Sequence, residues 1–158
     1  MKLILRFATA LLPLSLLLTC CTPVFASSID ENAPDAQALA QLELRAQQAG
    51  PRDQCFLYTE LVHSMTELAG KEMLAGETDE ATATLKRVDH YAHLIHMALA
   101  AKDKRLKNAE MLMHHTIQRL SDYMHAASGD DQVALKSTLK QLDQVHGEIL
   151  TQVFAPGS

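Results

Sequence analysis

Apolar residues recur in alternating steps of four and three along the stretch from Thr78 to Ser128. No glycine or proline falls within it, and only Lys102 and Thr116 interrupt the apolar series. A repeat held in one phase for about seven heptads is typical of helix that packs lengthwise against other helices. The other members of the series are Ala81, Leu85, Val88, Ala92, Ile95, Leu99, Leu106, Ala109, Met113, Leu120, Tyr123 and Ala127.

This pattern predicts either one continuous helix, roughly 75 Å long at about 1.5 Å per residue, or two helices joined by a turn at residues 102–104. We favour the continuous helix, because Ala100, Ala101 and Leu106 are good helix formers and no residue there favours a positive φ. The preceding helix would then pack on its first half and the last helix on its second half. The hairpin is the alternative, since five charged residues within 102–107 would suit an exposed corner.

Turn residues delimit the remaining helices. Pro34 suits the first turn of a short helix, which Gly50-Pro51 stops. A second helix is expected over residues 52–75, ending at Gly76, and a last helix is expected to follow from Asp130.

The composition agrees with helices and excludes some functions. Aromatic residues make up 4% of the chain and tryptophan is absent, which disfavours strands. We therefore expect one all-α domain over residues 27–158, a helical bundle of four to five helices. The net charge is −5 without a basic run, so nucleic acid and anionic membrane surfaces are poor candidates for partners.

The N-terminus has the pattern of a secretory signal peptide over residues 1–26. Lys2 and Arg6 precede a short apolar run at 11–18, and Ala26 offers a small residue for cleavage. That run is too short for a membrane span. The chain is therefore expected to be exported, to the periplasm or beyond the cell.

The three cysteines bear on the same question. A lipid anchor at Cys20 is the alternative to a free exported protein, although Thr19 stands where lipoprotein processing prefers Gly, Ala or Ser. Cleavage after residue 26 would remove Cys20 and Cys21 and leave Cys55 alone. We interpret Cys55 as a small buried hydrophobe, with an intermolecular disulfide or a reactive thiol as alternatives.

Eight histidines supply most of the candidate chemistry. His93 and His96 are three residues apart on one helix flank, and an i, i+3 pair of this kind can hold a transition metal. If the long stretch turns at residues 102–104, they would face His114, so these three are the candidate ligands for copper or zinc. Glu60-Leu61-Val62-His63 has the E-x-x-H form of di-iron bundles, but only one copy exists, and we interpret it as a solvated face.

Two resemblances add to this picture. The spacing of Leu68-Ala69, Gly76, Ala81 and Leu85 resembles a single tetratricopeptide helical hairpin. The segments Asp53-Gln54-Cys55-Phe56, Lys104-Arg105-Leu106-Lys107 and Leu150-Thr151-Gln152-Val153-Phe154 resemble a group of exported, all-helical bacterial proteins with no assigned activity. That resemblance implies an architecture and no chemistry.

The sequence favours binding over catalysis. It lacks a serine nucleophile elbow, a haem-attachment motif and a phosphate-binding glycine loop, so we expect no enzymatic activity. The leading hypothesis is a protein–protein interaction or scaffold module, with self-association through the long apolar seam as one form of it. The alternatives are a periplasmic metal-binding bundle rich in His and Met, and a periplasmic chaperone-like adaptor.

The export hypothesis has a direct test. Cleavage after Ala26 predicts a mature protein that begins at Ser27, which intact-mass and N-terminal peptide spectrometry of the native protein will detect. A diacylated species that begins at Cys20 would instead identify a lipid anchor.

Overall fold

The computed structural model describes residues 36–101, 103–127 and 129–155, so the expected signal peptide and Cys20 lie outside the described residues. The described part is all-α, as predicted, and contains no strand. None of its helices combines the length and the apolar character that a membrane crossing requires. The elements are α1 (Ala36–Gln48), α2 (Pro51–Leu74), α3 (Thr78–Ala98), the short 3₁₀ helix η1 (Leu99–Ala101), α4 (Leu106–Ala126) and α5 (Asp130–Val153).

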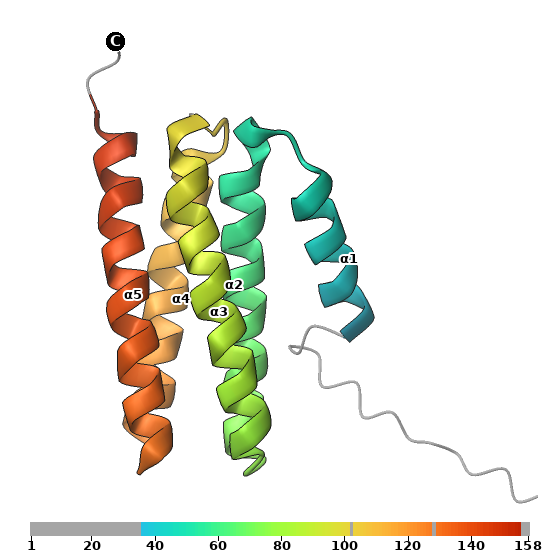
Figure 1. The fold of residues 1–158 in the computed structure, drawn as a ribbon. Coiled ribbons are helices and arrows are strands. Elements are labelled where there is room, and N and C mark those ends of the chain that lie inside the picture. The colour runs from blue at the N-terminus through green and yellow to red at the C-terminus, as the bar shows by residue number, and fades with distance from the viewer. Residues whose placement is uncertain (1–35, 102, 128, 156–158) are drawn as a thin grey trace, which may run out of the picture.

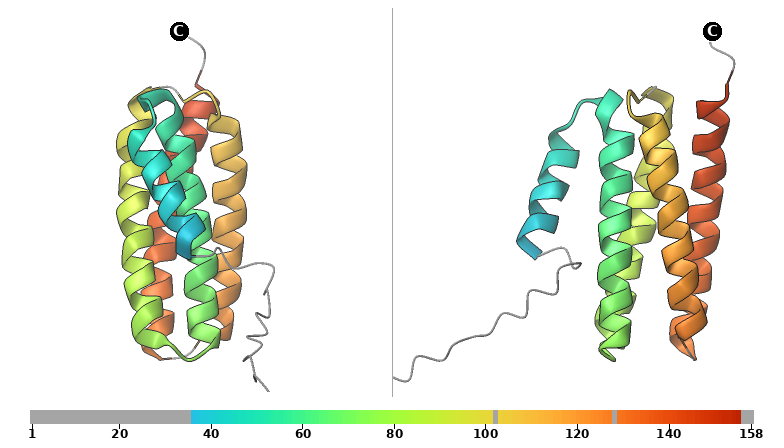
Figure 2. Two further views of the ribbon diagram at one scale, coloured as in Figure 1. Left: turned by 90° about the vertical axis from the view of Figure 1, so that its right-hand side faces the viewer. Right: turned by 180° about the vertical axis from the view of Figure 1, so that it is seen from behind.

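Helices α2 to α5 form a four-helix bundle, and α1 lies outside it against α2 (Figures 1 and 2). The bundle consists of two antiparallel hairpins, α2–α3 and α4–α5. They are laid side by side, so that α2 packs against α4 and α3 packs against α5. Each of these two neighbouring pairs runs parallel, whereas α3 and α4 stand on a diagonal and hardly touch.

The preference for one continuous helix between Thr78 and Ser128 was wrong. Helix α3 ends at Ala98, η1 continues to Ala101, and α4 begins at Leu106. The apolar phase survives the break because both helices turn the same set of heptad positions toward one shared core. The hairpin alternative is also modified, because the two helices that the turn joins lie across the bundle from each other.

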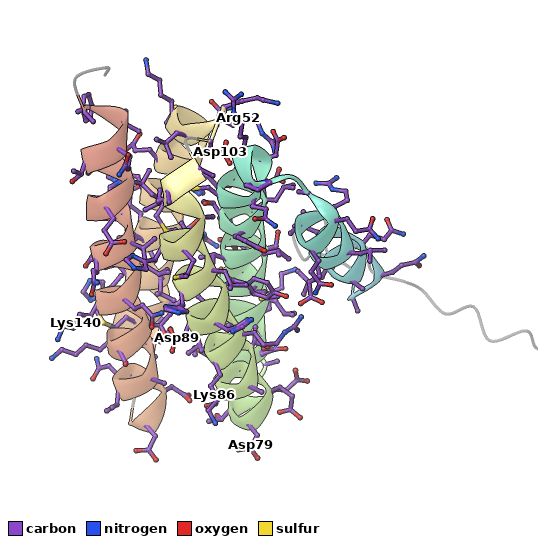
Figure 3. All side chains as sticks on the ribbon, turned by 45° about the horizontal axis from the view of Figure 1, so that its top comes forward. Arg52, Asp79, Lys86, Asp89, Asp103 and Lys140 are labelled. Atoms are coloured by element: carbon purple, nitrogen blue, oxygen red, sulfur yellow. The ribbon has the colours of Figure 1, made fainter. Side chains whose placement is uncertain are left out.

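Buried bonds hold the α3–α4 connection against the start of α2 (Figure 3). Asp103 is 8% exposed, and its carboxylate accepts from the backbone N–H of Phe56 at 3.0 Å and of Arg105 at 2.6 Å. The Lys104 N–H donates to the Arg52 carbonyl at 3.1 Å. Phe56 N–H and Arg52 C=O are the donor and acceptor of one backbone hydrogen bond in a regular helix. The connection therefore bonds to both groups of one such pair in α2.

The core accounts for the threonine that interrupts the heptads. Thr116 is fully buried, and its hydroxyl donates to the Leu112 carbonyl at 2.7 Å. Thr59 and Thr66 make the same bond to the carbonyl four residues earlier. A threonine that satisfies its own hydroxyl in this way occupies a core position without an orphan polar group.

Cys55 is also part of this core, as predicted, with no exposed surface. Burial, aided by the charge of Asp103, raises the pKa of its thiol to about 12. The thiolate is therefore scarce at neutral pH, and a reactive role for this cysteine is disfavoured.

The turns within the two hairpins agree with the sequence prediction. Gly76, after α2, has φ of +79°, and Gly129, before α5, has φ of +63°, a region that glycine enters without steric cost. Helix α2 ends two residues before Gly76 and α5 starts directly after Gly129.

Helix α1 packs through one face and is held by charged side chains at its edges. Leu39 and Ala46 are buried. Glu43 pairs with Arg87 of α3 and accepts from the Tyr91 hydroxyl at 3.1 Å. Arg45 lies 3.4 Å from Glu60 of α2, and Glu60 borders the surface described in the next subsection.

Asp103→Ala tests the importance of the connection. The substitution removes the carboxylate that accepts from the Phe56 and Arg105 N–H groups, and bonds to a charged group contribute about 1.5–3 kcal/mol each. We expect a loss of roughly 2–3 kcal/mol in the free energy of unfolding, measured by urea denaturation followed by circular dichroism. Asp143→Ala, at an exposed aspartate of α5, is the control and should change stability by less than about 0.5 kcal/mol. Equal stability of the two variants would contradict the assignment.

Candidate functional site

The seam between α2 and α4 carries a row of three surface hollows, hereafter the α2/α4 groove. On each helix its lining residues recur every three or four positions, which places them on one face. From α2 they are Phe56, Glu60, His63, Glu67, Gly70, Met73 and Leu74. From α4 they are Asn108, Met111, Leu112, His115, Arg119, Tyr123 and Ala126.

One end of the α2/α4 groove is apolar. Phe56, Met111 and Leu112 line a hollow of about 550 Å³, and Met111 is 68% exposed. The Arg105 guanidinium lies 3.9 Å from the centre of the Phe56 ring, so a cation–π contact holds this ring. A flexible thioether beside an aromatic ring is a surface that can adapt to an apolar side chain.

A charged network fixes the middle of the groove. Arg119 donates two bonds to the Glu67 carboxylate, at 2.7 and 2.9 Å. It donates a third to the Tyr123 oxygen at 2.6 Å, and the Tyr123 hydroxyl donates to Glu67 at 2.8 Å. The bond from Arg119 lowers the pKa of Glu67, whereas burial followed by the bond to Glu67 raises the pKa of Tyr123 to about 12. The network therefore keeps one charge state across the physiological range.

The helices approach each other closely below this network. A Cβ atom at Gly70 would lie 2.2–2.5 Å from ring carbons of Tyr123, closer than atoms pack in protein interiors. A glycine near the C-terminal end of α2 is therefore required by the contact with α4, and the contact places the Tyr123 hydroxyl beside Glu67.

His63 occupies the middle of the groove with a defined hydrogen-bond pattern. Its Nδ1 lies 3.0 Å from the Thr116 hydroxyl oxygen. The Thr116 hydroxyl donates its own proton to the Leu112 carbonyl, so it can only accept from His63, and Nδ1 carries the ring proton. Burial lowers the pKa of His63, as do His115 and Arg119, while Glu67 opposes them.

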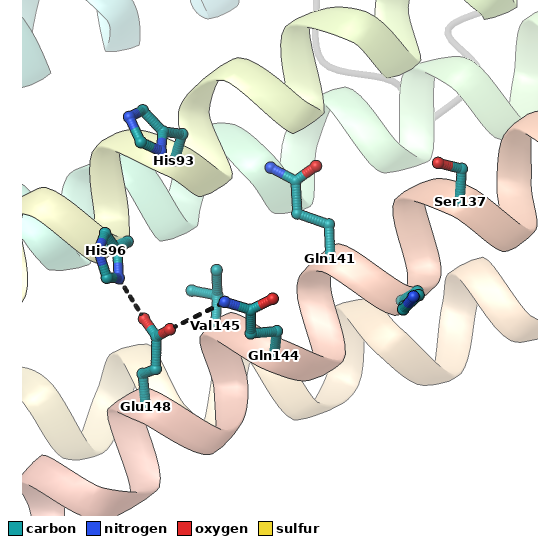
Figure 4. Close-up of a pocket in the computed structure, with 8 residues that line it drawn as sticks. His93, His96, Ser137, Gln141, Gln144, Val145 and Glu148 are labelled. Carbon is teal, nitrogen blue, oxygen red and sulfur yellow. Dashed lines mark hydrogen bonds and ion pairs between the residues drawn. The ribbon is translucent and has the colours of Figure 1, made fainter.

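The predicted ligands His93 and His96 lie elsewhere, between α3 and α5 (Figure 4). Their rings stack with centroids 6.1 Å apart beside a hollow of about 440 Å³. His96 Nδ1 lies 2.6 Å from Glu148, which also accepts from Gln144 at 3.2 Å. Burial works to raise the pKa of Glu148, but these bonds outweigh it and the net effect lowers that pKa.

The third predicted ligand, His114, faces α5 on another seam. Its ring lies 5.7 Å from that of His146, and its Nε2 lies 3.1 Å from the Gln118 amide nitrogen. The diagonal placement of α3 and α4 separates His114 from His93 and His96, so the structure does not bring the predicted triad together. Across the described ranges, no group of three or more His, Cys, Asp or Glu is arranged to hold a metal ion.

Sequence reasoning missed the residues that define the groove. We predicted a solvated His63 because it lies away from the apolar residues of its own helix. It is half-buried because α4 packs against that side of α2. Gly70 within a helix and the heptad break at Thr116 were the available signals.

Comparisons with protein-family models, curated proteins and solved structures find no match to this chain.

A pair of glycine substitutions tests the close approach of α2 and α4. Gly70→Ala should destabilise the fold by roughly 1–3 kcal/mol, because the added methyl group must displace the Tyr123 ring. Gly147→Ala, in α5 with no atom near the new Cβ, should stabilise it by roughly 0.5–1 kcal/mol through helix propensity. Thermal and urea unfolding measure both values, and a gain of stability in both variants would refute the contact.

Proposed function

We propose that this protein is an interaction module that binds an amphipathic helical segment of a partner protein in the α2/α4 groove. The observation that carries the proposal is the groove itself, which runs along two parallel helices with apolar residues at both ends. Amphipathic helices commonly bind in such grooves through residues spaced three and four positions apart. The same spacing recurs along both walls of this groove.

The charges of the groove suggest the character of that segment. Glu60 is paired with Arg45, and Glu67 with Arg119, so each of these two carboxylates of the groove already has a basic partner. A partner helix would therefore gain most from apolar side chains placed against Phe56 and Met111, with a polar residue at the level of the histidines.

Helix α1 supports the proposal as an example within the same molecule. It docks on the outside of α2 by burying Leu39 and Ala46 while Glu43 and Arg45 pair with charges on α3 and α2. A short apolar stripe flanked by paired charges is thus sufficient for a helix to pack on this bundle.

Self-association is a weaker alternative than it was from sequence alone. The heptad positions that could have formed an intermolecular seam, including Leu85, Ile95 and Met113, are buried within one molecule. A second copy would have to use an exposed surface such as the groove.

We further propose that the protein acts without catalysis, since the raised pKa of Cys55 disfavours nucleophilic chemistry, and that it acts after export.

Photocrosslinking tests the proposed surface. A photoreactive amino acid replaces Met111 in the groove or, as the matched control, Met97 of α3. These two methionines have similar exposed fractions, 68% and 63%, so the substitutions should perturb folding equally little. We expect a discrete protein adduct in the producing cells from position 111 and none from position 97.

The mass of the adduct distinguishes the occupants. A partner polypeptide crosslinked through a helical segment supports the proposal, whereas an adduct of twice the chain mass would assign the groove to a second copy. Absence of an adduct at position 111, or equal labelling at both positions, would reject the groove as the binding surface.

A further inference from the structure

His63 presents an unoccupied ligand atom to the middle of the α2/α4 groove. Because Nδ1 donates to Thr116, the lone pair of the ring is on Nε2. Across the parts of the chain that the structure describes, Nε2 has no hydrogen-bond partner. A hollow of about 450 Å³ lies here, lined by His63, Glu67, His115 and Arg119. It has room for an ion with its water ligands.

A second imidazole lies at the distance that a shared ion requires. The ring centroids of His63 on α2 and His115 on α4 are 5.5 Å apart, with the ring planes at 55°. Two imidazoles that bind one ion at about 2.0–2.1 Å from each nitrogen have centroids roughly 5–5.5 Å apart. The centroid separation of the pair agrees with this range.

The Thr116 bond has the form of support found around histidine ligands in metalloproteins. A histidine that binds a metal usually donates its other N–H to a fixed acceptor, which sets the tautomer and the orientation of the ring. Here Thr116 is fully buried and is itself bonded to the Leu112 carbonyl. Among the described residues His115 has no comparable bond, whereas the predicted ligand His96 has one, to Glu148 at 2.6 Å.

The charged groups around the pair permit a divalent cation. Arg119 is the nearby cation, and its charge is balanced by two bonds to Glu67. The remaining facing group is the Tyr123 hydroxyl, which is held in the same network.

We propose that His63 and His115 bind one divalent transition-metal ion, Zn²⁺ or Cu²⁺, with water completing the coordination. Imidazole nitrogens suit these two ions, and the usual order of affinities places Cu²⁺ above Zn²⁺. Thr116 is a positioning residue that orients the His63 ring. Two protein ligands make this an open and exchangeable site, consistent with the lack of any group of three or more ligands among the described residues.

The other histidine pairs are less suitable. In the pair on α3, His96 Nδ1 is engaged by Glu148. In the pair between α4 and α5, His146 Nε2 lies 3.2 Å from Glu110 and His114 Nε2 is engaged by Gln118. The ring centroids of these two pairs lie 6.1 and 5.7 Å apart, farther than the roughly 5–5.5 Å expected of two imidazoles that share one ion.

Calorimetric titration of the protein with ZnCl₂ and with CuCl₂, in a non-coordinating buffer at neutral pH, tests the site. We expect one ion per chain, with affinity reduced at least about tenfold in His63→Ala and in His115→Ala. The matched control is the double variant His93→Ala with His96→Ala, which should bind as the parent does. Because metal salts alone are the probes, the result is independent of the partner binding proposed above.

The Thr116→Val variant tests whether Thr116 orients the His63 ring or only fills space in the core. Valine fills the same volume but cannot accept from His63, and loss of such support costs about 10- to 100-fold in metal affinity. Long-range proton–nitrogen NMR correlations should show a proton on Nδ1 of His63 in the parent and a mixture of tautomers in this variant. Circular dichroism of the metal-free proteins verifies the fold, and His115 is exposed, so His115→Ala should fold normally.

The proposal fails if the parent binds neither ion. It fails equally if His115→Ala binds as the parent does, or if binding is lost in the His93 and His96 variant. A parent-like affinity of Thr116→Val, together with an unchanged tautomer, would remove the positioning role.

Discussion

The attachment of the α3–α4 connection to the first turns of α2 is the constraint on which the arrangement depends. This connection crosses the diagonal of the bundle, a longer path than a turn between neighbouring helices. The buried Asp103 carboxylate and the Lys104 N–H bond to the backbone of α2 and so place the start of α4 beside the start of α2. From that point the two helices run in the same direction, and α5 returns parallel to α3.

The groove and its chemistry follow from this alignment. Residues at equivalent heights on α2 and α4 come together in order, first Phe56 with Leu112, then His63 with Thr116, then Glu67 with Arg119 and Gly70 with Tyr123. An antiparallel pairing of the same two helices would place different residues opposite one another. The apolar hollow, the histidine pair and the charged network are therefore consequences of one topological choice.

Local sequence signals were sufficient for the elements and insufficient for their partners. The helix expected over 52–75 is Pro51–Leu74, and the last helix starts at Asp130 as predicted. These features depend on nearby glycines, prolines and periodic apolar residues, which act over a few positions. The break between α3 and α4 was missed because heptad phase reports which face is buried and says nothing about which helix covers it.

The site was less predictable for the same reason. Asp103 within a charged segment looks solvated until the Phe56 N–H of α2 and the Arg105 N–H of its own segment donate to its carboxylate. His93, His96 and His114 were grouped on the assumption that helices joined by a turn pack together, and the diagonal placement of α3 and α4 removes that assumption. Thr116 is the residue that could have directed attention to His63, because a polar residue in a core series calls for a partner.

The parallel seams also have a consequence for how the molecule assembles. Three hydrogen bonds across these seams each join residues 52 positions apart. They are His96 with Glu148, Arg119 with Glu67, and Gln141 with Asp89. Within each hairpin, by contrast, the chain reverses at a single glycine turn and contacts form between segments close in sequence. Contacts that close long loops cost more chain entropy and form later. We therefore expect the two hairpins to form first and the groove to be completed last, so that the proposed binding surface exists only in the fully assembled molecule.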